Sequence, residues 1–207
     1  MSVGDEVLLI NLQGSNTAFG NVGNYETLRV ESQNQNVVTF SQAKTKYYGD
    51  GTADDTNLGM LYGSQRVMLQ RVPNYNNLVV NNGINYFPNA WNGIRGGVIF
   101  FRAKNASLNG TVHSNEKGYI GGIGSTTSGT SNRVGGNGGE AFCGVGGNGS
   151  GSGTGGNGAG GGGAGAQSSA NGGAGYCGGG GGATTSTGIG GVGSSSSGGA
   201  GGGGGGL

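Results

Sequence analysis

The sequence has little charge and almost no proline, cysteine or histidine. Of its 207 residues 9% are charged, and the chain has two prolines, two cysteines and one histidine. The net charge of +1 gives no field that would attract nucleic acid or an anionic membrane surface. The chain also has no run of 18 apolar residues. We therefore expect neither a nucleic-acid partner nor a membrane-spanning segment.

The residues of the familiar catalytic sites are scarce as well. His113 is the single histidine, and it alternates with Thr111 on an expected strand, which is typical of a surface residue. The sequence contains no recognisable nucleophile and base set, paired-carboxylate motif, phosphate-binding loop or dinucleotide fingerprint. We expect a protein that is not an enzyme and that needs no cofactor.

One polar segment, residues 47–57, is rich in carboxylates. Asp50, Asp54 and Asp55 lie close together in it, and clustered oxygen donors are what calcium prefers. Their spacing does not match the EF-hand loop, so a solvated turn is the favoured interpretation and calcium ligation is the alternative. Two cysteines and one histidine are too few for a zinc site, so no other metal is expected.

Glycine is abundant, and it is concentrated near the end of the chain. Of the 56 glycines, 38 lie within residues 135–207, where Glu140 is the only charged residue. A flexible linker is one interpretation, because ordering glycine loses more backbone entropy than ordering any other residue. Larger side chains at every third position, as at Asn171, Ala174 and Cys177, instead favour a helix of the polyproline II type. Collagen is excluded because the triplets are irregular and contain no proline.

We therefore expect residues 125–207 to form a bundle of polyglycine II helices. Helices with bare edges approach closely and satisfy their backbone groups by pairing with one another. A disulfide between Cys143 and Cys177 would join two glycine tracts and would imply an oxidising, extracellular setting. Two reduced, buried thiols are the alternative.

The rest of the chain favours short strands and no α-helix. Residues 1–72 predict a strand and hairpin region, because apolar residues alternate or run together in 6–12, 25–31, 37–40 and 66–72, with a hairpin over 25–40. Residues 73–124 predict solenoid-like turns of strand, with strands at 77–81, 84–87, 97–103 and 107–113 separated by Asn-Gly and Gly-Gly turns. The fold class is therefore all-β, with an irregular β-sandwich as the alternative to a β-solenoid.

Several stretches carry a resemblance. The segments VGNYETLRV, KTKYYGDG, VMLQRVPNYNNLVVNNG, AWNGIRGGVIFFRA and LNGTVHSNEKGYIGG resemble the N-terminal parts of large glycine-rich surface proteins associated with bacteria and phages. In those proteins a β-rich part of solenoid character runs into a glycine-rich region with motifs such as GAGYCGGGGG. By composition the C-terminal part is also similar to the polyglycine helix bundles of phage adhesins and of a glycine-rich antifreeze protein.

These observations favour a structural protein that assembles with copies of itself outside the cell, as a fibre, a sheath or a surface layer. Bare backbone and few charges leave little to oppose association between copies. The alternative is a phage or bacterial adhesin that binds a cell-surface receptor or glycan through the loops between its glycine helices. Ice binding by a flat Ser and Thr face is a third hypothesis. The expected location is the cell surface or a virion.

Overall fold

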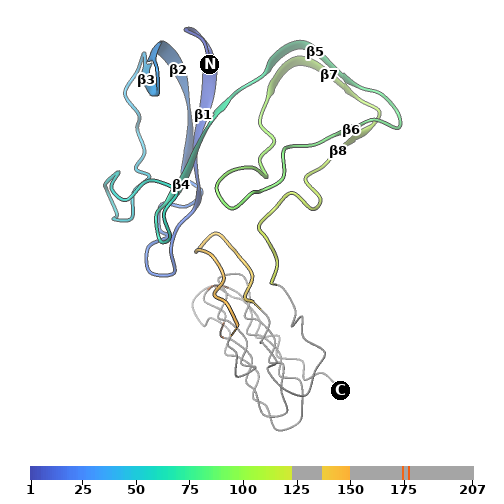
Figure 1. Ribbon diagram of the computed structural model, residues 1–207. Helices are drawn as coiled ribbons and strands as arrows, with labels where there is room; N and C mark the ends of the chain where they lie inside the picture. The colour runs from blue at the N-terminus through green and yellow to red at the C-terminus, as the bar shows by residue number, and fades with distance from the viewer. Residues whose placement is uncertain (123–136, 150–173, 175–176, 178–207) are drawn as a thin grey trace, which may run out of the picture.

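The computed structural model describes residues 1–122, 137–149, 174 and 177. In this part of the chain there is no helix, and a curled antiparallel sheet lies beside two pairs of parallel strands (Figure 1). The described part thus has the predicted strand-rich, helix-free character. Most of the expected polyglycine bundle, including its loops, lies outside the described residues.

The antiparallel sheet has four strands in the order β3-β2-β1-β4. They are β1 (Glu6–Gln13), β2 (Tyr25–Asn34), β3 (Val37–Phe40) and β4 (Arg66–Arg71). All four predicted strands of this region are present, and the hairpin over 25–40 is confirmed. The second strand runs on to Asn34, beyond the predicted end at 31, because its polar residues pair with β3 around a turn in which Gln35 has a φ of 50°.

Alternation along these strands gives the sheet two apolar faces. On one face Val7, Leu28 and Val30 form a buried cluster. On the other face Leu12 and Met68 pack with Trp91, which comes from a later loop. The indole therefore joins the following part of the chain to the sheet.

The parallel strands belong to two successive passes of the chain. The first pass, residues 74–86, contains β5 (Asn74–Val80) and β6 (Asn85–Tyr86), and the second, residues 102–112, contains β7 (Arg102–Leu108) and β8 (Thr111–Val112). β5 pairs with β7 and β6 pairs with β8, both in parallel. We call residues 74–112 the parallel unit.

Two predicted strands of this region differ from the observed ones, and glycine lies at both differences. The predicted strand over 97–103 is wrong for its first five residues, because the strand begins only at Arg102; Gly97, the first residue of the predicted strand, has a φ of 77°, which a strand does not accommodate. The predicted strand over 107–113 is divided by a bend at 109–110. At Gly110 an added Cβ would collide with the carbonyl oxygens of Asn81 and Ile84, so only glycine fits against the first pass there.

Candidate functional site

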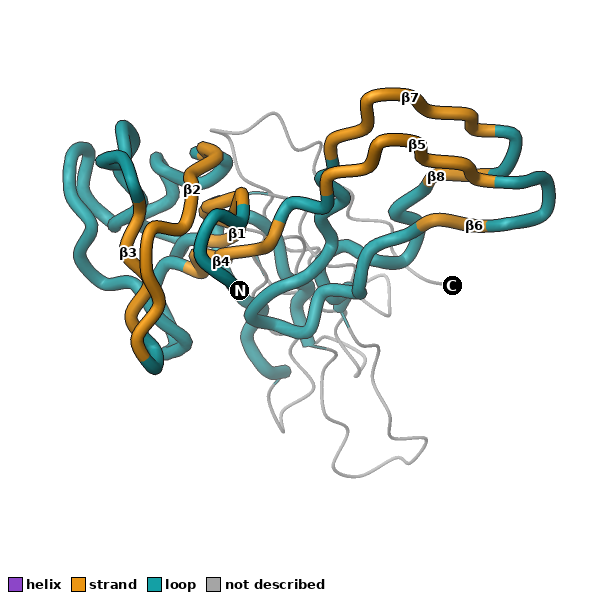
Figure 2. Tube along the Cα trace, turned by 90° about the horizontal axis from the view of Figure 1, so that it is seen from above, coloured by secondary structure: helices purple, strands orange, loops and turns teal. Residues whose placement is uncertain are grey.

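The parallel unit exposes unpaired backbone edges. Within the described chain, β5 pairs only with β7 and β6 only with β8, so each sheet has two strands. No described loop forms a backbone hydrogen bond with the outer side of β5 or β7. Figure 2 shows the unit standing clear of the four-stranded sheet. Open edges of this kind are templates for pairing with further strands.

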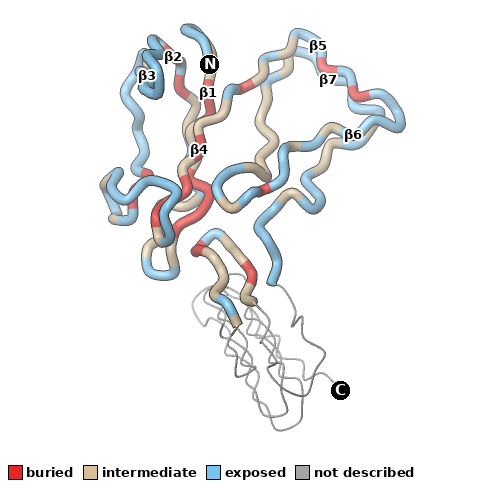
Figure 3. Tube along the Cα trace, viewed as in Figure 1, coloured by how far each residue is buried: buried red, intermediate tan, exposed pale blue. Residues whose placement is uncertain are grey.

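Side chains at paired positions of the two passes differ sharply in exposure. Val80 is 3% exposed, whereas its partner Leu108 is 51% exposed. Leu78 is buried, whereas its partner Ala106 is exposed. The second pass therefore covers the first, but no described residue covers the second in the same way (Figure 3).

An asparagine ladder links the two passes. The side-chain Nδ2 of Asn105 donates to Oδ1 of Asn77 at 3.0 Å and to the carbonyl oxygen of Asn76 at 3.4 Å. Stacked amides of this type are a feature of strands that repeat in register. The amide Nδ2 of Asn77 and the Oδ1 of Asn105 make no hydrogen bond within the described chain. The ladder therefore has a donor end and an acceptor end.

Aromatic rings fill the space between the two parallel pairs. The ring of Phe101 packs edge-on against Tyr75 and Tyr86, with centroid distances of 6.3 and 5.6 Å. Burial raises the pKa of Tyr86, and its hydrogen bond with Tyr75 acts in the same direction. The three rings therefore pack as one aromatic cluster.

Glu6 fastens both passes to the four-stranded sheet. Its carboxylate accepts hydrogen bonds from Nε of Arg102 at 2.8 and 2.9 Å and from Nδ2 of Asn74 at 3.3 Å. Asn74 and Arg102 are paired residues at the starts of β5 and β7. The bond from Arg102 lowers the pKa of Glu6, against the opposing effect of burial.

The first described segment of the glycine-rich region is a tight hairpin, residues 137–149, which we call the glycine hairpin. Ala141 and Gly144 exchange two backbone hydrogen bonds, at 3.0 and 3.1 Å. Gly138 donates to the carbonyl oxygen of Gly147 at 3.0 Å. The two arms approach so closely that a Cβ on Gly146 would overlap the carbonyl of Gly138. Gly146 must therefore be glycine, because any side chain there would keep the two arms of the hairpin apart.

Gln13, at the end of β1, anchors the glycine hairpin to the sheet. Its buried amide Nε2 donates to the carbonyl oxygens of Ala141 at 2.9 Å and Gly144 at 3.1 Å. The next residue, Gly14, donates its backbone N–H to Phe142 at 2.8 Å. Phe142 also packs edge-on against Phe19, with ring centroids 5.7 Å apart. The hairpin is thus held by backbone acceptors and one aromatic pair.

Glu140, the only charge of residues 135–207, is used in the same junction. Its Oε2 accepts a hydrogen bond from the Trp91 indole at 2.5 Å and one from the backbone N–H of Ile120 at 3.3 Å. Beside it, the Tyr119 hydroxyl donates to the carbonyl oxygen of Leu12. Burial and the nearby charge of Glu140 raise the pKa of Tyr119 to about 12. The loop around Trp91, the segment at Tyr119 and Ile120, and the glycine hairpin therefore meet at this carboxylate.

Cys143 and Cys177 form a disulfide, with their Cα atoms 6.4 Å apart. Cys143 is fully buried at the tip of the glycine hairpin, next to the carbonyls that Gln13 holds. The bond therefore connects a later part of the glycine-rich region to the segment that is docked on the sheet.

The three aspartates of the predicted calcium alternative hold a turn. Asp50 accepts hydrogen bonds from Thr56 and Asn57 at 3.0 and 3.1 Å, and Asp54 accepts from the backbone of Gly51 and Thr56, both at 3.3 Å. Asp55 pairs with Lys44. Among the described residues no group of three His, Cys, Asp or Glu side chains is placed to hold a metal ion. The carboxylates are occupied by local donors, and calcium ligation there stays a prediction.

The sequence analysis overlooked the asparagine ladder and Gln13. A signal for the ladder exists, because the segments NLVVN and NASLN begin at Asn77 and Asn105 and place Leu78 and Val80 opposite Ala106 and Leu108. For Gln13 the sequence shows only a polar residue at the end of an apolar strand, and this does not indicate which residue its side chain binds.

No helix among the described residues is long and apolar enough to cross a membrane. The chain matches no protein-family model. Comparison with curated proteins finds no match. Comparison with solved structures finds none either.

Proposed function

We propose that this chain is the subunit of a self-assembling, extracellular structural protein that forms a fibre, a sheath or a surface layer. The observation that carries the proposal is the incomplete parallel unit, in which Leu108 is 51% exposed opposite a buried Val80. A further strand on β7 would bury Leu108 and pair the open backbone edge at the same time.

The parallel unit is poorly stabilised by its own contacts. A two-stranded sheet is marginal in water, and three or more strands or a packed face are normally needed. Of the seven residues of β7, six are exposed. We interpret the two passes as two coils of a β-solenoid whose open ends are completed by other copies of the chain.

The asparagine ladder favours association head to tail. The acceptor Oδ1 of Asn105 on β7 complements the donor Nδ2 of Asn77 on β5. A two-fold pairing of β7 on β7 would instead bring two Asn105 acceptors together. Rotating the Asn105 amide so that it offers a donor there would break its hydrogen bond with Asn77. Contacts between different surfaces generate rings or fibres, as the proposed function requires.

The glycine-rich region fits the same role. The glycine hairpin is held by backbone carbonyls and a disulfide, which supports a setting outside the reducing cytosol. We propose that the polyglycine bundle over 125–207 continues from this junction. The resemblance to glycine-rich surface proteins of bacteria and phages also supports a structural role outside the cell. Under this proposal the chain is not an enzyme.

Sedimentation velocity over a concentration series, with electron microscopy of the same samples, tests the proposal. We expect the sedimenting mass to rise with concentration and regular rings or fibres to be visible. A single monomeric species across the whole range would overturn the function proposed here.

Two variants separate strand pairing from unspecific clustering. Leu108→Glu places a charge on the open edge and should abolish assembly, because charged residues at edges oppose pairing. Leu61→Glu is the control, since Leu61 is 79% exposed in a loop away from the edges. Equal assembly by both variants would contradict the role of the edge.

Cysteine cross-linking tests the direction of association. Protein carrying Asn77→Cys, mixed with protein carrying Asn105→Cys, should form mixed disulfide dimers on mild oxidation. Dimers formed mainly within either variant alone would contradict the head-to-tail arrangement while leaving self-assembly intact.

A further inference from the structure

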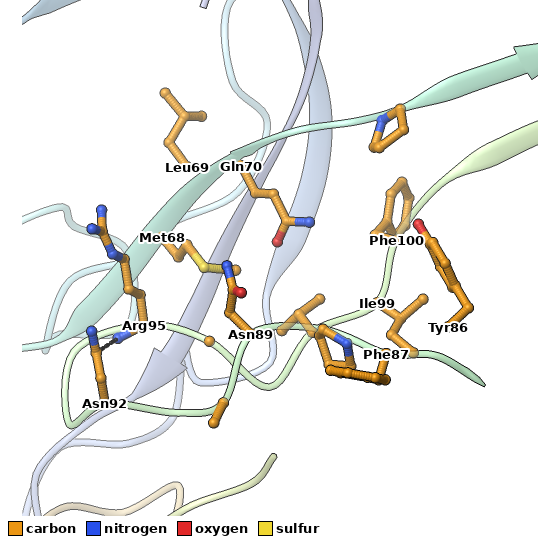
Figure 4. Close-up of a pocket in the computed structure, with 15 residues that line it drawn as sticks. Met68, Leu69, Gln70, Tyr86, Phe87, Asn89, Asn92, Arg95, Ile99 and Phe100 are labelled. Atoms are coloured by element: carbon orange, nitrogen blue, oxygen red, sulfur yellow. Dashed lines mark hydrogen bonds between the residues drawn. The ribbon is translucent and has the colours of Figure 1, made fainter. Parts of the chain in front are cut away.

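We infer that the cavity between β4 and residues 86–100 binds a saccharide. The cavity has a volume of about 580 Å³, a size that suits a small ligand. Its walls come from Met68 and Gln70 on the four-stranded sheet and from the segment that leads from β6 to β7 (Figure 4). Asn77, Asn105 and Leu108, on which the proposed assembly depends, are not among the residues that line it.

Two amide side chains reach into the cavity from opposite walls. Gln70 lies on β4 and Asn89 on the facing loop, and the amide groups of both are directed into the space between them (Figure 4). Neither side chain forms a hydrogen bond with another described residue, whereas Asn92 accepts from the backbone of Ile94 and Arg95 at 3.1 and 3.0 Å. An amide carries both donors and an acceptor, which is what the hydroxyl groups of a sugar require.

Aromatic and apolar groups form the remainder of the wall. Tyr86, Phe87, Ile99 and Phe100 line the cavity. The ring of Phe87 is held by the Lys117 ammonium, 4.8 Å from its centroid, and by the His113 ring at 5.6 Å. Aromatic rings supply apolar contact area with little loss of conformational freedom, and the C–H faces of a pyranose ring fit such surfaces.

The charge of the lining limits the class of ligand. Among the described residues, Arg95 is the only charged one that lines the cavity. Phosphate-rich ligands such as nucleotides are normally held by several cations or by a glycine-rich loop at a helix start, and the described chain has no helix. An entirely apolar ligand would leave Gln70 and Asn89 without partners. A neutral sugar, or one with a single carboxylate, satisfies both groups.

The loop that forms the outer wall is already ordered. The backbone N–H of Gly97 donates to the carbonyl oxygen of Asn89 at 2.8 Å, and the backbone N–H of Trp91 donates to the carbonyl oxygen of Lys117 at 2.9 Å. The buried Trp91 side chain fixes this loop against the sheet. A ligand would therefore bind a preformed site and would not have to order it.

Titration of the purified full chain, followed by ¹⁵N NMR, tests the inference with four probes: glucose, galactose, N-acetylglucosamine and N-acetylneuraminic acid. We expect at least one to shift the side-chain amide signals of Gln70 and Asn89. A response to N-acetylneuraminic acid alone would assign the site to acidic sugars through Arg95, and a response to the others would assign it to neutral sugars. No shift of these signals with any probe would overturn the inference.

Matched variants locate the binding. Gln70→Ala and Asn89→Ala should each weaken the affinity about 5–10-fold, the equivalent of one lost hydrogen bond. Asn76→Ala, which removes an exposed amide outside the cavity, should leave the affinity unchanged. Since Asn89 is an exposed loop residue, its variant is expected to keep the fold, which the NMR spectrum reports. Equal affinity in the Asn89 and Asn76 variants would place the sugar elsewhere and contradict the assignment.

Discussion

The four-stranded sheet and the parallel unit differ in how completely they bury their apolar side chains. In the sheet Val7, Leu28 and Val30 are 0, 2 and 1% exposed. In the parallel unit the first pass buries Leu78 and Val80, whereas Leu108, the second-pass partner of Val80, is 51% exposed. The core of the sheet thus comes from its own chain, whereas the second pass of the parallel unit leaves an apolar side chain in water at a position that the first pass buries.

Their polar side chains differ in where the unused hydrogen-bonding groups lie. In the sheet, Asn11 donates to Gln65 at 2.9 Å, and Gln65 donates to the carbonyl oxygen of Ala18 at 2.8 Å, while the Oδ1 of Asn11 is buried without a partner among the described residues. In the parallel unit the unused groups of Asn77 and Asn105 belong to exposed residues at the two ends of the ladder. A buried unused group cannot reach another copy of the chain, whereas one at an exposed edge is available to a partner.

Truncating one leucine in each region should show the difference most strongly. Leu28→Ala removes a buried side chain from the sheet, and we expect the free energy of unfolding to fall by about 2–5 kcal/mol. Leu108→Ala should change it by less than about 0.5 kcal/mol in the monomer, as is usual for surface sites. Urea denaturation at low protein concentration measures both. A similar loss in the two variants would show that the monomer already buries Leu108.

Gly110 tests how closely the two passes are packed. Gly110→Ala forces a Cβ against the carbonyl oxygens of Asn81 and Ile84, and overpacking of this kind costs about 1–3 kcal/mol. We expect faster hydrogen exchange in β5 to β8 than in the sheet, measured by NMR or mass spectrometry.

Gly118→Ala is the matched control for that experiment. No atom lies within 4 Å of a Cβ built at Gly118, so this variant should exchange like the original chain. If Gly118→Ala loosened the parallel unit as much as Gly110→Ala, the close contact at the bend would not be its cause.

The sequence predicted the sheet well and the parallel unit less well, for a physical reason. Residues 6–12 and 25–31 form strands whose apolar residues are buried by neighbours nearby in the chain, so their pattern is strong. Gly97, before the second pass, and Gly110, within it, lie against the backbone of distant residues, namely Lys117 in the first case and Asn81 in the second. Such contacts leave no periodic trace in the sequence.

The candidate site was harder to predict than the fold. Asn77 and Asn105 become neighbours only through parallel pairing, and a sequence rich in asparagine does not single them out. Gln13 binds the backbone carbonyl of Ala141, 128 residues away. Because every residue type has this carbonyl, the identity of residue 141 gives no sign of the contact. The saccharide site likewise combines β4 with a loop that follows it after two strands.

A substitution at Gln13 tests whether the glycine hairpin depends on its hydrogen bonds to the sheet. Gln13→Ala removes two hydrogen bonds, one to the buried carbonyl of Gly144 and one to the partly buried carbonyl of Ala141, at about 1 kcal/mol each, so we expect a loss of about 2 kcal/mol. The amides of residues 138–144 should then exchange faster while β2 and β3 stay protected. Gln33→Ala, an exposed glutamine on β2, is the control and should have little effect.

The smallest expected effect concerns Glu6, which joins the two regions. Because its pKa is lowered in the folded protein, its contribution is fully present above the ordinary value of about 4.3 and is lost as the pH falls through the lowered value. Arg102 is 53% exposed, so solvent screening limits this contribution to less than about 1 kcal/mol at neutral pH. The difference in unfolding free energy between the original chain and Glu6→Gln should therefore shrink as the pH falls below about 4.3. Glu31→Gln is the control, because Glu31 is exposed and has no ion pair to any described residue, and its difference from the original chain should not change in this way. A change of equal size in the Glu31 variant would contradict the role of Glu6 in joining the sheet to the parallel unit.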